Sequence, residues 1–227
     1  RVARWDGSAW STLGGGLGSR PVRALATLPG GDIVAGGDFG RVVRWDGAAW
    51  STIGDFNGPV HALVVMPNGD LIAGGQFYGP CWNCYNILRW DGTVWSPLGD
   101  LTDGPVFALA VMPNGDLIAG GRFYAAGGVP TGAIARWNGT SWSALGTGIP
   151  TVSGVYALAV LPNGDLVAGG GFGSAGGVPV NMIARWDGAA WSALSGWQEA
   201  DGAVADGWRH AGGYYKDPAV RVRARAE

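Results

Sequence analysis

RWDGAAW, at residues 44–50, recurs without a changed letter at residues 185–191, and near-copies of it occur at three other places. The near-copies are RWDGSAW, RWDGTVW and RWNGTSW, which begin at Arg4, Arg89 and Arg136. A second phrase keeps step with the first, in the forms LPGGDIVAGG, MPNGDLIAGG (twice) and LPNGDLVAGG, which end at Gly37, Gly75, Gly121 and Gly170. Similarity that returns at intervals of 40 to 49 residues indicates a repeat architecture.

Each repeat contains two turn signals, and together they predict four short strands. In VYALAVLPNGDLVAGGGF, from Val155, two apolar runs flank Asn163-Gly164. The following IARWDGAAW, from Ile183, has a second turn at Asp187-Gly188. Asn-Gly and Asp-Gly between apolar runs are strong hairpin signals. Four antiparallel strands per repeat, without helical segments, are typical of a β-propeller blade.

The number of repeats predicts an all-β, five-bladed propeller that forms one domain over residues 1–227. The repeats lie at about 1–13, 22–53, 60–98, 106–145 and 155–194. A degenerate repeat at 198–227 aligns with the preceding unit without gaps, so that Ala200 falls on Ala157. We expect this tail to supply the first two strands of a closing blade and residues 1–13 to supply the other two, which removes exposed sheet edges. The alternative is a piece of a longer propeller, in which the tail is no blade.

The tail fits the repeat imperfectly. Gln198 and Asp201 stand where other units place Val and Leu. The closing blade is therefore expected to be the weakest. The chain also begins in the middle of a repeat, which fits a processed product, a fragment or an incompletely known sequence.

Composition excludes several partners. The net charge of −2 and the pI near 5.6 give no general attraction to nucleic acids or anionic membranes. No apolar run reaches the ~18 residues that a transmembrane helix needs. Thirteen tryptophans and a charged fraction of 14% argue against disorder despite 43 glycines.

The RWDG phrase is interpreted as a structural brace rather than a reactive site, because a motif required in every blade more often serves the fold. A two-residue turn places Trp5 and Trp10 on the same face, and the equivalent pairs then pack blade against blade. Asn138 in place of the aspartate favours turn chemistry over catalysis. The arginine either pairs with the aspartate of P-N-G-D or stacks on a tryptophan. The Gly-Gly doublet is expected to let neighbouring sheets approach closely.

These features resemble known families of repeats. A Gly-Gly doublet that closes the second strand, an aromatic-Asp pair in the third and a tryptophan in the fourth resemble Kelch-type propeller repeats. GGxF followed by IARWDGxxW is similar to the Rax2-like family of fungal cell-polarity proteins and related secreted bacterial repeats. The sequence departs from Kelch in having Arg-Trp where a tyrosine is typical. The resemblance implies a propeller that binds proteins or cell-surface material, and it carries over no catalytic residues.

Binding is expected on one face of the propeller. The loops between second and third strands and the links between blades emerge on the same face and differ in length and chemistry, whereas the hairpins of the other face are nearly identical. Variable loops on a rigid scaffold are a frequent place for binding. Aromatic candidates in these loops are Tyr78, Trp82, Tyr85 and Tyr124.

A second candidate site is the variable position of V-x-A-L. Its occupants are Arg23, His61, Phe107, Tyr156 and, in the degenerate repeat, Glu199. These residues begin the innermost strands, so they are expected to ring the mouth of the central channel. Aromatic rings, a cation and hydrogen-bonding groups at a concave mouth suit a sugar or a peptide side chain. The alternative is ordinary packing between blades or solvated positions.

Cys81 and Cys84 form a C-x-x-C phrase inside the most unusual variable loop. A local disulfide that stiffens an extracellular loop and a pair of free thiols both remain open. Zinc is not expected, because the chain has only His61 and His210 as further ligands of that kind. We therefore expect no metal site and no cofactor.

The hypothesis from sequence is a secreted or cell-surface, non-catalytic module that binds a protein or glycan. No G-x-S-x-G elbow, H-E-x-x-H helix or phosphate-binding loop is present, so no enzyme activity is expected. The first alternative is a scaffold subunit of a larger extracellular assembly. The second is a glycoside hydrolase that uses aspartates of the interblade links, Asp55, Asp100 and Asp103.

Overall fold

The computed structural model describes residues 2–81, 84–100, 102–150 and 154–194, and these residues form 22 strands and no helix. Sixteen of the strands make four sheets, each an antiparallel meander of four strands. The first two sheets contain β3 (Val22–Thr27), β4 (Ile33–Gly37), β5 (Arg41–Trp45), β6 (Trp50–Asp55), β7 (Val60–Val65), β8 (Leu71–Tyr78), β9 (Tyr85–Trp90) and β10 (Trp95–Pro97). The other two contain β11 (Val106–Val111), β12 (Leu117–Gly121), β15 (Ile134–Trp137), β16 (Trp142–Ala144), β17 (Val155–Val160), β18 (Leu166–Gly170), β21 (Ile183–Trp186) and β22 (Trp191–Ala193).

Three two-stranded hairpins accompany these sheets. The N-terminal hairpin consists of β1 (Ala3–Trp5) and β2 (Trp10–Thr12). Two smaller hairpins lie in the loops between the second and third strands of the last two sheets. They are β13 (Ala125–Ala126) with β14 (Val129–Pro130), and β19 (Ser174–Ala175) with β20 (Val178–Pro179).

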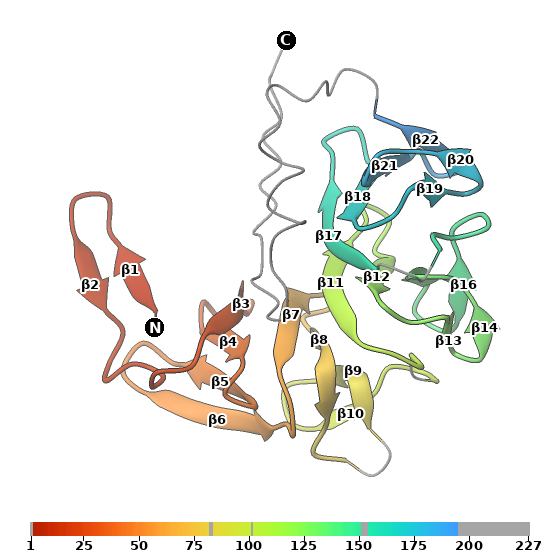
Figure 1. Cartoon of the computed structure of the whole chain (residues 1–227). Coiled ribbons are helices and arrows are strands. Elements are labelled where there is room, and N and C mark those ends of the chain that lie inside the picture. Colours follow the sequence, from red (N-terminus) through yellow and green to blue (C-terminus); the bar gives the residue numbers. More distant parts are fainter. Residues whose placement is uncertain (1, 82–83, 101, 151–153, 195–227) are drawn as a thin grey trace.

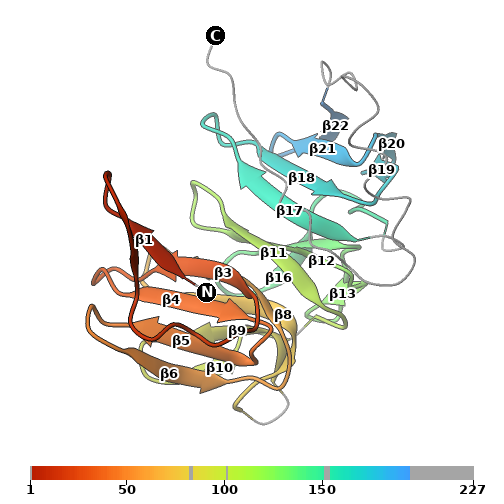
Figure 2. The same cartoon turned by 60° about the vertical axis from the view of Figure 1, so that its left-hand side comes forward.

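The sheets are arranged as propeller blades. Their first strands, β3, β7, β11 and β17, pack against one another in chain order, and the sheets follow one another along an arc (Figure 1). A turned view shows the same succession of sheets (Figure 2). The β1–β2 hairpin lies at one end of the arc and the sheet of β17 to β22 at the other, and no strand pairing joins these ends within the described ranges. The expected closing repeat, 198–227, lies outside the described residues.

The RWDG hairpins form as turn chemistry predicts. Trp5 lies directly opposite Trp10, with ring centroids 5.5 Å apart. The Asp6 carboxylate accepts hydrogen bonds from the N–H groups of Ser8 and Ala9, both at 2.8 Å. Asn138 accepts the equivalent bonds from Thr140 and Ser141 through its side-chain oxygen. An acceptor at this position of the turn is therefore what the motif requires.

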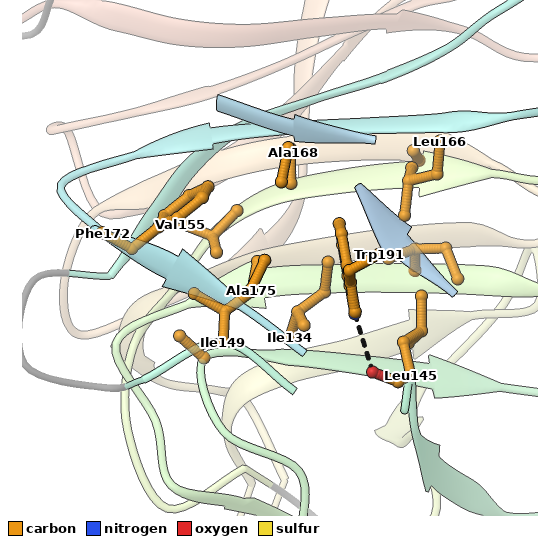
Figure 3. Close-up of a cluster of buried hydrophobic side chains, with 13 residues drawn as sticks. Ile134, Leu145, Ile149, Val155, Leu166, Ala168, Phe172, Ala175 and Trp191 are labelled. Carbon is orange, nitrogen blue, oxygen red and sulfur yellow. Dashed lines mark hydrogen bonds between the residues drawn. The ribbon is translucent and has the colours of Figure 1, made fainter. Parts of the chain in front are cut away.

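The second tryptophan of the hairpin joins its blade to the preceding one. Its indole Nε1–H donates to a backbone carbonyl at the end of the preceding sheet, which is the N-terminal hairpin for Trp50 and a complete blade for the other three. The four bonds are Trp50 to Leu13 (2.9 Å), Trp95 to Ile53 (2.7 Å), Trp142 to Leu98 (3.0 Å) and Trp191 to Leu145 (2.8 Å). In the last pair of blades, Trp191 lies among Leu166, Ile134 and Leu145 in a buried cluster (Figure 3). The motif is thus a brace between blades.

The Gly-Gly doublet makes close contacts in two directions. A Cβ built on Gly120 would lie 2.7 Å from Val155 Cγ1 of the next blade, and Gly36 and Gly74 are equally close to Val60 and Val106. The second glycine instead lies against the start of its own blade, as Gly121 does beside the Pro105 carbonyl. The expected close approach of neighbouring sheets therefore holds for the first glycine only.

The arginine of each RWDG phrase in the four complete blades pairs with the aspartate of the P-N-G-D turn. Two of these pairs are Arg89–Asp70, at 2.6 Å, and Arg185–Asp165, at 2.5 Å. Equivalent pairs join Arg44 to Asp32 and Arg136 to Asp116. Of the two possibilities that the sequence left open, the structure shows the ion pair.

Candidate functional site

Each first strand has a β-bulge at the variable position of V-x-A-L. In β7, the pairing with β8 shifts between Val60 and Ala62, which leaves His61 as the extra residue. The same shift in β3, β11 and β17 leaves Arg23, Phe107 and Tyr156 as the extra residues. A bulge removes one residue from the ladder and redirects its side chain. We call Arg23, His61, Phe107 and Tyr156 the bulge row.

Three members of the bulge row form a continuous line of rings across three blades. The His61 and Phe107 rings meet edge to face with centroids 5.3 Å apart. The Phe107 and Tyr156 centroids are also 5.3 Å apart. All three side chains are half-buried. Ring pairs at this separation attract one another beyond simple burial, so the line is held in place.

The fourth member, Arg23, lies in an ion pair with Asp38. Its Nη2 donates to Asp38 Oδ2 at 3.0 Å and its Nε donates to Oδ1. The two side chains are only 23% and 26% exposed. A two-pronged arginine–carboxylate contact is strong and directional. This end of the row therefore presents a neutral pair rather than a free cation.

Asp38 belongs to a second set of variable residues that sequence reasoning missed. It directly follows the Gly-Gly doublet, where the other blades have Gln76, Arg122 and Gly171. The Asp38 N–H donates to the carbonyl of Pro21 at 3.0 Å, which holds this position beside the bulge. Equivalent bonds hold the other three positions. The sequence signal that could have identified this set is the variation of the residue after the doublet, in GGDF, GGQF, GGRF and GGGF.

The aromatic candidates of the variable loops do not form one cluster within the described residues. Tyr78 and Tyr85 lie opposite each other at the base of the β8–β9 loop, with ring centroids 6.4 Å apart. Cys81 and Cys84 form a disulfide in that loop. Tyr78 is 69% exposed and Tyr124 is 61% exposed. Trp82 and Glu199 lie outside the described residues.

The loops and the interblade links meet on one face, as expected. Asn57 of one link pairs with Tyr78, and Thr102 of the next link pairs with Ala126. Val129, Val178 and Met182 add exposed apolar side chains to these loops.

Asp103, in one of the acidic links, holds the loop of the third blade in place. The Asp103 carboxylate accepts hydrogen bonds from the N–H groups of Tyr124 and Ala125, at 2.7 and 3.0 Å. Asp55 lies 3.7 Å from Arg41. Across the described ranges, no three His, Cys, Asp or Glu side chains gather in a way that would hold a metal ion. The same ranges contain no helix with the length and apolarity needed to cross a bilayer.

Comparison with known proteins shows the fold and no family. No protein-family model and no curated protein matches the sequence. The Kelch-like and Rax2-like resemblance therefore stays a prediction.

Solved structures match at low sequence identity. The extracellular domain of BT4673 from B. thetaiotaomicron has a TM-score of 0.56 at 11% identity, over 81% of this chain and 23% of that chain. PorZ, a bacterial surface component of the type-IX secretion system of Porphyromonas gingivalis, has a TM-score of 0.51 at 13% identity, over 81% of this chain and 28% of that chain. The WD40 β-propeller domain of Doa1 also matches, with a TM-score of 0.42 at 16% identity, over 72% of this chain and 49% of that chain.

This chain spans about a quarter of the length of the first two proteins. The four antiparallel four-stranded sheets, whose first strands pack in chain order, define an all-β fold of the propeller type.

Proposed function

We propose that the chain is a non-catalytic module, secreted or at the cell surface, that binds a protein or glycan on its variable-loop face. The observation that carries this proposal is the bulge row. Four neighbouring blades each use a bulge at the same position, and three of the redirected side chains form one line of rings. Bulges are often found where a side chain is aimed at a ligand.

The chemistry of the row suits a sugar ring or an extended peptide. Aromatic faces pack against C–H groups, and a few polar groups beside them fix orientation. Gln76 and Arg122, both exposed, offer an amide and a cation at positions beside the bulges. The Arg23–Asp38 pair bounds the row at its other end.

An extracellular setting is supported by the Cys81–Cys84 disulfide, because disulfides persist mainly in oxidising compartments. The BT4673 structure is an extracellular domain, and PorZ is a bacterial surface component. We propose the same setting for this chain.

Ring closure is part of the proposal, because it would complete a channel mouth around the row. Each end of the arc leaves a place that a neighbouring blade fills elsewhere. Among the described residues, Gly169 has only the Ala157 Cβ, at 3.9 Å, near the place where Gly120 meets a valine of the next blade. At the other end, Leu25 is 52% exposed, whereas Leu63 and Leu109 pack against a glycine of the preceding blade.

The degenerate repeat at 198–227 is in step with the other repeats, so a blade formed from it would cover the places beside Gly169 and Leu25. We propose that 198–227 forms the first half of a fifth blade, with Gln198 against Gly169, and that residues 1–13 form its second half. Trp10 is 71% exposed, and the Leu194 carbonyl occupies the sequence position of the acceptors that Trp95 and Trp142 use. In the closed ring, Trp10 Nε1 donates to that carbonyl.

A binding screen tests the proposed function. Chain 1–227 is applied to a glycan array and to a displayed peptide library, beside Phe107→Ala and Tyr156→Ala. Val94→Ala is the control, because Val94 is 59% exposed in an Asp-Gly turn of the opposite face. We expect a ligand of the parent chain to lose at least about tenfold in affinity in the row variants, which corresponds to ~1.4 kcal/mol, and to be retained by the control.

Melting temperatures close to that of the parent chain show that the variants are folded. The proposal is wrong if folded Phe107→Ala and Tyr156→Ala bind every ligand as tightly as the parent, or if the folded parent binds nothing in either screen.

A further inference from the structure

A groove of about 270 Å³ lies on the outer part of the first complete blade. It is bounded by Leu17 of the link that precedes the blade and by Trp50 and Ser51 of β6, with Phe39, Val43 and the charged Arg41 also in its lining. The groove shares no residue with the bulge row.

Two later blades fill the equivalent place with a hairpin of their own. In the third complete blade, the β13–β14 hairpin lies between the preceding link and Trp142, the second tryptophan of the blade. It contacts the link through the pairing of Thr102 with Ala126. A Cβ built on Gly127 would lie 2.9 Å from Trp142 Cδ1. In the fourth, a Cβ on Gly176 would lie 2.7 Å from Trp191 Cδ1, and the Gly176 N–H donates to the Gly148 carbonyl of the link at 2.8 Å.

The first blade lacks such a hairpin. Only Asp38, Phe39 and Gly40 connect β4 to β5. Trp50 is accordingly half-buried, whereas Trp142 and Trp191 are each 5% exposed. The groove is therefore the place that the hairpin occupies elsewhere in the same molecule.

Both filling hairpins have the same sequence, Ala-Gly-Gly-Val-Pro, at residues 126–130 and 175–179. We infer that the groove of the first blade is a docking site for a short apolar turn of this kind, provided by a partner protein.

The chemistry of the groove favours this occupant. Gly127 and Gly128 have φ values of 60° and 72°, which glycine adopts readily, and the lack of a Cβ on the first lets the backbone approach the indole. Trp50 is already held by its bond to the Leu13 carbonyl, so its ring needs no rearrangement to receive the turn. Preorganisation of this kind reduces the free energy lost on binding.

The probe is a cyclic peptide that contains Ala-Gly-Gly-Val-Pro, titrated into the full chain and followed through the Trp50 indole N–H signal in NMR spectra. Trp50→Phe assigns the signal. The comparison peptide is Ala-Val-Val-Val-Pro in the same ring. We expect a saturable shift of the Trp50 signal with a dissociation constant of about 1 mM or tighter for the first peptide, and no saturable shift for the second.

Two variants show whether the peptide occupies the groove. Replacing Gly40 with residues 124–132 gives the first blade its own hairpin, and Ser51→Lys places a charged chain at the groove wall without changing the core. Both are expected to abolish the shift while a bulge-row ligand still binds, which separates this inference from the proposed function. The inference is overturned if both peptides act alike, or if the shift persists in Ser51→Lys or in a folded hairpin variant.

Discussion

The indole nitrogen of the second tryptophan ties each blade to the one before it. Trp142 is 5% exposed and donates to the Leu98 carbonyl. We expect Trp142→Phe to lower the free energy of unfolding by about 2 to 4 kcal/mol, because the carbonyl loses its donor and the smaller ring leaves a cavity. Urea denaturation measures this loss.

Trp137→Phe is the matched control, since Trp137 lies directly opposite in the same hairpin and is half-buried. It keeps the Trp142–Leu98 bond, so a loss of about 1 kcal/mol is expected. Equal losses in the two variants would show that the bond between blades contributes little.

The turn aspartates give the fold a specific acid dependence. Hydrogen bonds from the backbone N–H groups of Val94 and Thr93 and from the Thr93 hydroxyl lower the pKa of Asp91 from 3.8 to about 2. Backbone bonds from Ala9 and Ser8 do the same for Asp6. The lowered pKa means that these carboxylates stabilise the folded state above about pH 4, and that this stabilisation is lost as the pH falls towards 2.

Asp91→Asn tests this dependence, because Asn138 already serves as the acceptor in another blade. The variant is expected to keep nearly the parent stability at pH 7 and to lose less between pH 4 and pH 2. A free energy of unfolding that falls equally steeply with acid in both chains would contradict the assignment.

At the scale of the strand, the first glycine of each doublet sets how closely two blades approach. Gly120→Ala is expected to destabilise the fold by about 1 to 3 kcal/mol, because its Cβ would overlap Val155 Cγ1. Adding Val155→Ala makes room for that Cβ. A double-mutant cycle should therefore show coupling of at least about 0.5 kcal/mol, and strict additivity would mean that the two residues do not meet.

The strands and turns were predictable because they depend on local chemistry. Asn-Gly and Asp-Gly fix the hairpins, and alternation places Trp5 beside Trp10. The bulge at His61 was not predicted, because it depends on the register between two strands. The variation within V-x-A-L did identify the four positions of the bulge row. Their contacts with residues such as Asp38 could not be predicted, because these contacts also depend on the register between strands. The groove at Trp50 was not predictable from the sequence either. It results from a short loop, and the position of that loop relative to Trp50 depends on the three-dimensional structure.

At the scale of the whole molecule, the repeat specifies how blades pack but not how the arc ends. The described residues leave Gly169 facing only Ala157, while Leu25 and Trp10 are exposed at the other end. A fifth blade shared between the two chain ends would cover all three, and it would give the bulge row a closed channel mouth.

The most direct test of this closure compares Gly169→Ala with Gly120→Ala by urea denaturation of chain 1–227. Closure predicts that both lower the free energy of unfolding by about 1 to 3 kcal/mol, because each Cβ then meets a side chain of the next blade. If the place beside Gly169 is empty, replacing this glycine leaves stability unchanged or raises it by up to about 1 kcal/mol, because the unfolded chain loses freedom. That second result, alongside the expected loss in Gly120→Ala, would contradict a closed five-bladed ring.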